Sequence, residues 1–257
     1  MGNEKADKTM EMKTRMEIDI KNRIEKIEER IEAACHRSGR CRDEIKLMAV
    51  TKFFPPEAVE AAYKAGIRLF GESRVQEGTE KYSKFFQMHP SIEAGTGSVE
   101  LHLIGSLQRN KAKKAAAFFD CIQSVDRESL VDELGVLTME RNCPLMILLE
   151  YHTGEETKAG FQDLKSLLRA AEKTLSLPGL HPIGLMTMAP YTTDEKVIRA
   201  SFRKLSAARE ELLKQFKIGK ESWPCLSMGM TNDFEIAIEE GSNLIRLGTA
   251  IFGESRA

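Results

Sequence analysis

The sequence of 257 residues has almost no excess of charge of either sign. Its 38 Lys and Arg residues nearly balance its 39 Asp and Glu residues, giving a formal net charge of -1. The sequence therefore does not favour a nucleic acid or an anionic membrane as the main partner. It also lacks an apolar run long enough to span a bilayer, and its charged N-terminus has no signal-peptide core. We expect a globular protein with no membrane segment.

Cysteine and histidine are sparse, and neither has the spacing of a structural site. The five cysteines are odd in number and scattered, and none forms a C-x-x-C pair. A disulfide framework or a structural zinc site is therefore not expected. The five histidines show no ligand spacing either, so we expect no metal. A reducing cytoplasm is the location that fits best.

A dinucleotide-binding fingerprint is also missing. A doubly wound sheet would have G-x-G-x-x-G after its first strand, where this chain has Thr51-Lys52-Phe53-Phe54. Short, nearly continuous apolar runs instead alternate with helical segments, which is typical of a parallel sheet buried on both faces. Counting from Leu47 gives eight such strands, and ~250 residues is typical of a (β/α)8 barrel. We predict a single TIM barrel domain over residues 1–257, with residues 1–11 frayed and the doubly wound sheet as the main rival.

An extra helix is expected before the barrel. Ile20, Ile24, Ile27 and Ile31 recur at helical spacing between charged residues, and the pattern ends near Ser38-Gly39. A helix for a partner or a coiled coil is one interpretation. The apolar stripe is short for a sustained heptad array, so we expect the helix to dock on its own domain.

Lys52 follows the apolar segment 47–50 and precedes two prolines that end the strand. If the strand is buried, Lys52 loses hydration, its pKa falls, and more of its amine takes the neutral form that attacks a carbonyl. The alternative is that Lys52 only marks where the strand leaves the core, because lysine is rarely buried.

Two later segments have the composition of a phosphate site. Ser227 and Gly229 follow the seventh expected strand, and Gly248 and Thr249 follow the eighth. Loops at these two positions of a barrel often bind phosphate through backbone N–H groups. The alternative is that the glycines only make turns and the hydroxyls only cap helices.

An imine-forming lysine beside a phosphate cradle suggests a phosphorylated aldehyde, and pyridoxal 5'-phosphate (PLP) is the obvious candidate. A class I aldolase acting on a sugar phosphate would use similar parts and remains the alternative from the residues alone. An aldolase also needs carboxylates for proton transfer. Only Glu72 and Asp126 lie at expected strand ends, and Asp126 has the position of a helix cap.

The motifs together resemble the YggS/PROSC family of pyridoxal phosphate homeostasis proteins from about residue 20 to the end. The resemblance rests on the following segments, in the family's order: Ala49-Val50-Thr51-Lys52, Phe70-Gly71-Glu72-Ser73, Val75-Gln76-Glu77, the segment from His102 to Lys111, Ser124-Val125-Asp126, Gly184-Leu185-Met186, Leu226-Ser227-Met228-Gly229-Met230 and the segment from Ile245 to Gly253.

The resemblance implies a barrel similar to the N-terminal domain of alanine racemase. It implies that Lys52 holds PLP as a Schiff base, with the phosphate against Ser227, Gly229, Gly248 and Thr249. It places Arg246 against the pyridine nitrogen, where a cation disfavours protonation of the ring. It also implies a protein that carries, buffers and delivers PLP, with PLP-dependent apoenzymes as partners and no well-established reaction of its own. We expect a monomer or a weak dimer.

Several positions depart from the family pattern. Ser73 and Tyr151 stand where the family usually has Asn, Thr231 replaces a Ser, and Phe53-Phe54 replaces a more polar pair. A PLP-dependent racemase or related enzyme remains the alternative function. Bacterial alanine racemase has a further β domain that supplies a tyrosine base, and we expect no such domain after the last strand. His102 could be a catalytic base, but we expect a packed or rim histidine.

Overall fold

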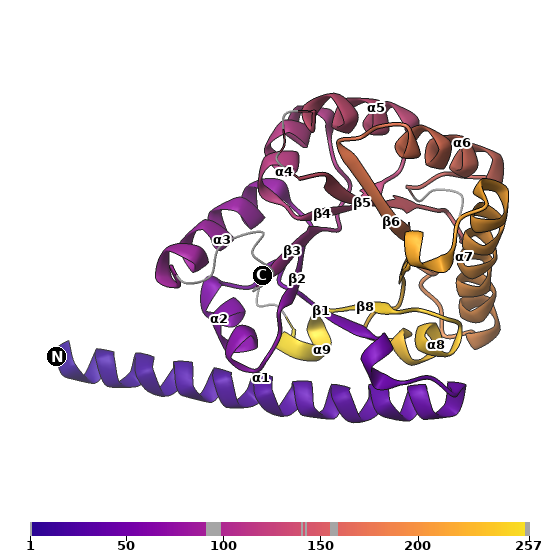
Figure 1. Ribbon diagram of the computed structural model, residues 1–257. Helices are drawn as coiled ribbons and strands as arrows, with labels where there is room; N and C mark the ends of the chain where they lie inside the picture. Colours follow the sequence, from indigo (N-terminus) through magenta and orange to yellow (C-terminus); the bar gives the residue numbers. More distant parts are fainter. Residues whose placement is uncertain (1, 91–98, 140, 142, 155–158, 255–257) are drawn as a thin grey trace.

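The computed structural model describes residues 2–90, 99–139, 141, 143–154 and 159–254. Eight parallel strands form a closed barrel in sequence order, so the predicted (β/α)8 fold is confirmed. Figure 1 shows the strands enclosed by helices. The strands are β1 (Lys46–Val50), β2 (Leu69–Glu72), β3 (Glu100–Leu103), β4 (Cys121–Val125), β5 (Leu145–Glu150), β6 (Leu180–Met186), β7 (Cys225–Ser227) and β8 (Leu244–Leu247).

Successive residues of each strand point to opposite sides of the barrel wall. Met48 and Val50 of β1 pack in the small cluster inside the barrel, whereas Leu47 and Ala49 join the large cluster between strands and helices. The strands are therefore buried on both faces, which explains their nearly continuous apolar sequence.

The helices follow the strands closely. From the sequence, Pro90, Gly95 and Gly97 predict a loop over residues 88–100, and most of that segment lies outside the described residues. The prediction that Asp126 caps α5 is wrong. The cap position is Arg127, and the Asp126 carboxylate accepts a hydrogen bond from the Arg127 guanidinium at 2.5 Å. The helices of the barrel are α2 (Pro56–Lys64), α3 (Val75–Met88), α4 (Ala112–Phe118), α5 (Glu128–Leu137), α6 (Leu164–Leu175), α7 (Glu195–Phe216), α8 (Phe234–Glu239) and α9 (Thr249–Phe252).

The helix α1 (Gly2–Ser38) precedes the barrel and packs against α2, α8 and α9. It starts at Gly2, so it includes most of the segment that was expected to be frayed. The four isoleucines of its apolar stripe, from Ile20 to Ile31, are all buried. The predicted docking of this helix on its own domain is therefore confirmed, because burial of the stripe against the barrel leaves none of it for a coiled coil.

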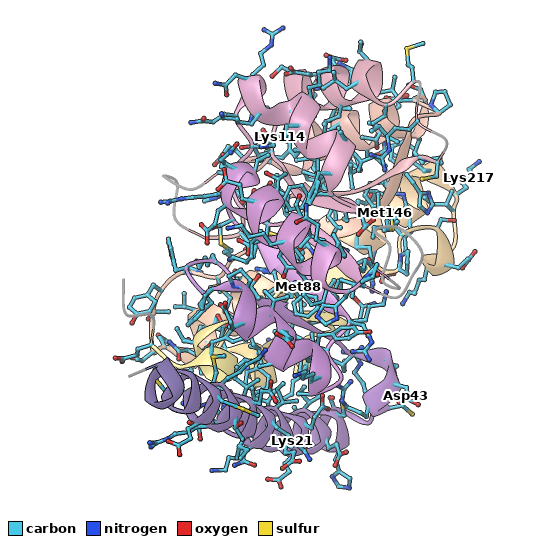
Figure 2. All side chains as sticks on the ribbon, turned by 90° about the vertical axis from the view of Figure 1, so that its left-hand side faces the viewer. Lys21, Asp43, Met88, Lys114, Met146 and Lys217 are labelled. Carbon is cyan, nitrogen blue, oxygen red and sulfur yellow. The ribbon has the colours of Figure 1, made fainter. Side chains whose placement is uncertain are left out.

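Charged side chains cover the outside of this assembly. Figure 2 shows Lys21 on α1 and Lys114 on α4 at opposite ends of the molecule. Within the described part of the chain, no helix combines the length and the apolar character that crossing a membrane requires.

Candidate functional site

A cavity of about 500 Å³ opens where the carboxyl ends of the strands meet. This is the end of a (β/α)8 barrel at which active sites are built. Four of the predicted site residues line it, namely Lys52, Arg246, Gly248 and Thr249. They come from the two ends of the sequence and meet because β1 pairs with β8 and closes the barrel.

Lys52 lies two residues beyond the end of β1. Counting inward positions from Met48 and Val50 places Lys52 on the cavity side, and it does line the cavity. Its side chain is exposed, which agrees with the interpretation that Lys52 marks the point where the strand leaves the core. The strand ends at Val50, and a turn closed by the Phe54 N–H and the Thr51 carbonyl at 3.0 Å carries Lys52 to the rim.

Arg246 occupies an inward position of β8, and its side chain is 4 % exposed. It donates one hydrogen bond to the Ser227 hydroxyl at 2.6 Å and another to the Thr187 carbonyl at 2.8 Å. Burial lowers the pKa of Arg246 to about 10, and the carboxylates of Asp233 and Glu150 oppose that shift. The guanidinium therefore stays charged at neutral pH and supplies a fixed cation to the cavity floor.

The loops after β7 and β8 lie side by side, as predicted. The hydroxyls of Thr231 and Thr249 are 3.1 Å apart, and both residues line the cavity. A Cβ atom at Gly248 would lie 3.2 Å from the Val50 carbonyl oxygen, so the backbone there runs close to β1. The N–H groups of Ile251 and Phe252 both donate to the Gly248 carbonyl at 2.9 Å, so the short helix α9 begins at this rim.

Ser227 and Gly229 are placed differently from the other predicted phosphate residues. Neither is part of the cavity lining. Gly229 has a φ of +97°, and a Cβ atom there would lie 2.6 Å from the Cβ atom of Ala237. Its role in the structure is thus to let the β7 loop turn against α8, while Ser227 fixes Arg246 from below.

Ser227 belongs to a chain of hydrogen bonds through the barrel interior. Its hydroxyl donates to the Gln123 side-chain carbonyl at 2.6 Å, and the Gln123 amide lies 2.7 Å from His102 Nδ1. His102 Nε2 lies 2.5 Å from the Glu100 carboxylate. His102 is thus buried and hydrogen-bonded on both ring nitrogens, which confirms a packed histidine. The chain orients the hydroxyl that holds Arg246.

Glu150 is a carboxyl group in the cavity that the sequence analysis did not identify. It ends β5, lines the cavity and is 4 % exposed. Burial and the nearby Asp126 carboxylate raise its pKa to about 7, against the attraction of Arg246. A group with this pKa can exchange a proton at neutral pH.

Comparison with known proteins places this arrangement in a family. The family model named "Alanine racemase, N-terminal domain" matches residues 23–256 of the sequence. The chain belongs to this family. The pyridoxal phosphate homeostasis protein of Aquifex aeolicus is 38% identical over 235 residues, which are 91% of this chain and 97% of that protein.

Two solved structures support the same placement. A protein of unknown function from Bifidobacterium adolescentis is 35% identical, with a TM-score of 0.85 over 92% of this chain and 96% of that one. PipY of Synechococcus elongatus, solved with PLP bound, is 32% identical, with a TM-score of 0.74 over 88% of this chain and 100% of that one. The resemblance of the motifs to the pyridoxal phosphate homeostasis proteins is therefore confirmed.

The two strongest departures from the family pattern have different positions. Ser73 lines the cavity, whereas Tyr151 does not. Tyr151 follows Glu150 and points outward, with the Lys204 ammonium 5.2 Å from its ring centroid.

The alternation of inward and outward side chains along β5 was the signal that could have identified Glu150, because Leu148 and Glu150 share the inner face.

Proposed function

We propose that this protein binds PLP as a Schiff base on Lys52 and acts in PLP homeostasis as a carrier and buffer of the cofactor. The observation that carries the proposal is that Lys52 and the buried cation Arg246 line one cavity at the barrel's carboxyl end. Two comparisons support it. The relative from Aquifex aeolicus is named a pyridoxal phosphate homeostasis protein, and the PipY structure contains PLP.

The residues present fit such a group. PLP supplies an aldehyde, which a neutral lysine amine can attack. Exposure of Lys52 at the rim leaves its amine accessible to a cofactor that enters from solvent. The backbone of Gly248 and the hydroxyl of Thr249 provide donors for a phosphate. Arg246 presents a cation rather than a carboxylate to the ring, which disfavours protonation of the pyridine nitrogen.

In this proposal Ser227 acts through Arg246, because its hydroxyl accepts a hydrogen bond from that guanidinium. Gly229 shapes the β7 loop that borders the proposed phosphate site. Within the cavity lining, the phosphate contacts that we propose are those of Gly248 and Thr249, with Thr231 beside them.

The cellular role extends the same proposal. A lysine at an open rim is accessible both for uptake and for release of the cofactor, and we propose PLP-dependent apoenzymes as the recipients. All five cysteines are free, which supports a reducing cytoplasm as the location. We also propose a monomer or a weak dimer.

Glu150 supports a second candidate function, a PLP-dependent racemase or related amino-acid enzyme. Proton transfer in such a reaction needs a group whose pKa lies near neutrality. Glu150 has a pKa of about 7 and shares the cavity with Lys52. Turnover of an amino acid that is lost in Glu150→Gln would favour this enzyme over the carrier.

The first experiment compares wild type with Lys52→Ala. We expect a yellow wild-type protein whose borohydride reduction leaves one pyridoxyl adduct on Lys52, found by peptide mass mapping. Lys52→Ala should lose the absorption band and keep its circular dichroism. Lys46→Ala is the matched control, because Lys46 is exposed at the opposite end of the same strand. A Lys52→Ala protein that keeps the band, or a colourless wild type that takes up no PLP, would contradict the proposal.

A further inference from the structure

The peptide groups on both sides of Lys52 are held by side chains of α3. The carbonyl of Thr51 accepts a hydrogen bond from Lys81 Nζ at 2.6 Å. The N–H of Phe53 donates to Glu77 Oε1 at 2.8 Å. Lys81 Nζ also lies 3.1 Å from the same Glu77 oxygen. Lys81 and Glu77 therefore form a bridge from the Thr51 carbonyl to the Phe53 N–H, which spans Lys52.

The bridge is anchored in the core by Glu72. Lys81 Nζ donates to Glu72 Oε1 at 2.7 Å, and the Thr51 hydroxyl donates to the same oxygen at 2.7 Å. The Tyr82 hydroxyl lies 2.9 Å from that of Thr51. The ammonium of Lys81 thus has an acceptor for each of its three hydrogens, namely Thr51, Glu72 and Glu77.

This arrangement lies deep in the protein. The Lys81 side chain is 6 % exposed and that of Glu72 is fully buried. Burial of an ion pair is costly, and apolar residues of similar volume often replace such a pair without loss of stability. Stability alone therefore does not account for a lysine at this position. Its backbone hydrogen bond to the turn gives it a second role, in fixing local geometry.

The turn itself needs such support. Phe53 has a φ of +67°, a left-handed conformation that residues other than glycine rarely adopt. Such conformations persist when the surrounding structure determines them, and they cluster at functional sites. The N–H of this strained residue is the one that Glu77 holds. The bridge therefore fixes the backbone on the C-terminal side of Lys52 as well as on the N-terminal side.

The geometry points to Lys81 and Glu77, anchored by Glu72, as positioning residues that hold the Lys52 turn so that the amine faces the cavity. The inference rests on the proposed function of Lys52 as the residue that bonds PLP. Neither Lys81 nor Glu77 lines the cavity, so both act through the backbone of the turn and not by contact with the cofactor. A misplaced reactive group can slow a reaction by two orders of magnitude.

The test compares Lys81→Met and Glu77→Ala with two matched controls on α3. Lys84→Met and Glu80→Ala make the same changes at exposed positions of that helix. PLP is removed from each full-length protein and added back. Formation of the Schiff base is then followed by absorbance over a range of pH. We expect it to slow by about tenfold or more in the two test variants and to be unchanged in the controls.

Hydrogen exchange of the turn supplies a readout that needs no cofactor. The Phe53 amide should exchange faster in Glu77→Ala than in wild type, because its acceptor is gone. Glu77→Gln restores an acceptor oxygen for that amide. It should therefore recover part of the rate of Schiff base formation. No recovery is expected if Glu77→Ala slows the reaction only by lowering the stability of the fold.

The outcomes separate the two proposals. Wild type without a Lys52 adduct overturns both the proposed function and this inference. Wild type with the adduct, but with wild-type rates and pH response in folded Lys81→Met or Glu77→Ala, overturns the inference alone. If Lys81→Met does not fold, Glu77→Ala decides, because Glu77 is partly exposed and leaves the buried Lys81–Glu72 pair in place.

Discussion

Glu150→Gln should change how the stability of the cofactor-free protein depends on pH. Glu150 is buried in the cavity, with its pKa raised from 4.5 to about 7 by burial and by Asp126. A raised carboxyl pKa means that the folded protein disfavours the ionised form. Wild type should therefore lose stability as pH rises from about 4.5 to about 7, and the loss should level off above that range.

The magnitude follows from the size of the shift. One pKa unit corresponds to about 1.4 kcal/mol, so the full titration of Glu150 costs wild type about 3 kcal/mol. Roughly three quarters of that cost falls between pH 5 and pH 8, because part of the unfolded-state titration is already complete at pH 5. The glutamine side chain does not ionise, so the free energy of unfolding of the variant should not fall in this way.

The assay is urea unfolding of both proteins at pH 5 and pH 8. The difference between the two proteins at pH 8, minus their difference at pH 5, cancels the other titrating groups. Glu172→Gln is the control, since Glu172 is exposed on α6. If the difference between wild type and Glu150→Gln is the same at both pH values, the argument from burial of Glu150 is wrong.

Two further predictions test the packing around the site. Ser227→Ala removes one hydrogen-bond partner from Arg246 and one from Gln123 in the core, so it should lower the free energy of unfolding by about 1–3 kcal/mol in urea titration; an unchanged midpoint would show that neither bond matters. Ile31→Ala should cost about 2–5 kcal/mol, because Ile31 is fully buried between α1 and the barrel. Ile18→Ala, at an exposed position of α1, should stay within about 0.5 kcal/mol, and equal losses would contradict the docking of α1.

Much of the fold could be predicted because each strand is buried on both faces. The apolar runs between 47 and 50 and between 145 and 149 cannot be solvated, so their number and spacing indicate a closed parallel barrel. The apolar stripe from Ile20 to Ile31 likewise predicted a docked helix. The prediction that Asp126 caps a helix was wrong, because its carboxylate binds the neighbouring Arg127 side chain.

The site was harder to predict because burial at a strand end depends on where the strand stops. The sequence left open whether Lys52 is buried or exposed, and the turn after Thr51 brings it to solvent at the rim. Ser227 stays a predicted phosphate residue, and only the structure shows that its hydroxyl also bonds Gln123 and Arg246. These partners are distant in sequence, so no local pattern reports them.

The sequence by itself determined the barrel, the family resemblance, and the two loops that follow β7 and β8. Local apolar periodicity and short motifs are properties of neighbouring residues, and a single chain displays them directly. Only the tertiary structure decided which polar side chains meet. The link from Lys81 to Thr51 joins residues 30 apart, and that from Ser227 to Gln123 joins residues 104 apart. Barrel closure creates these contacts, because it brings inward and outward faces of different strands and helices within hydrogen-bonding distance.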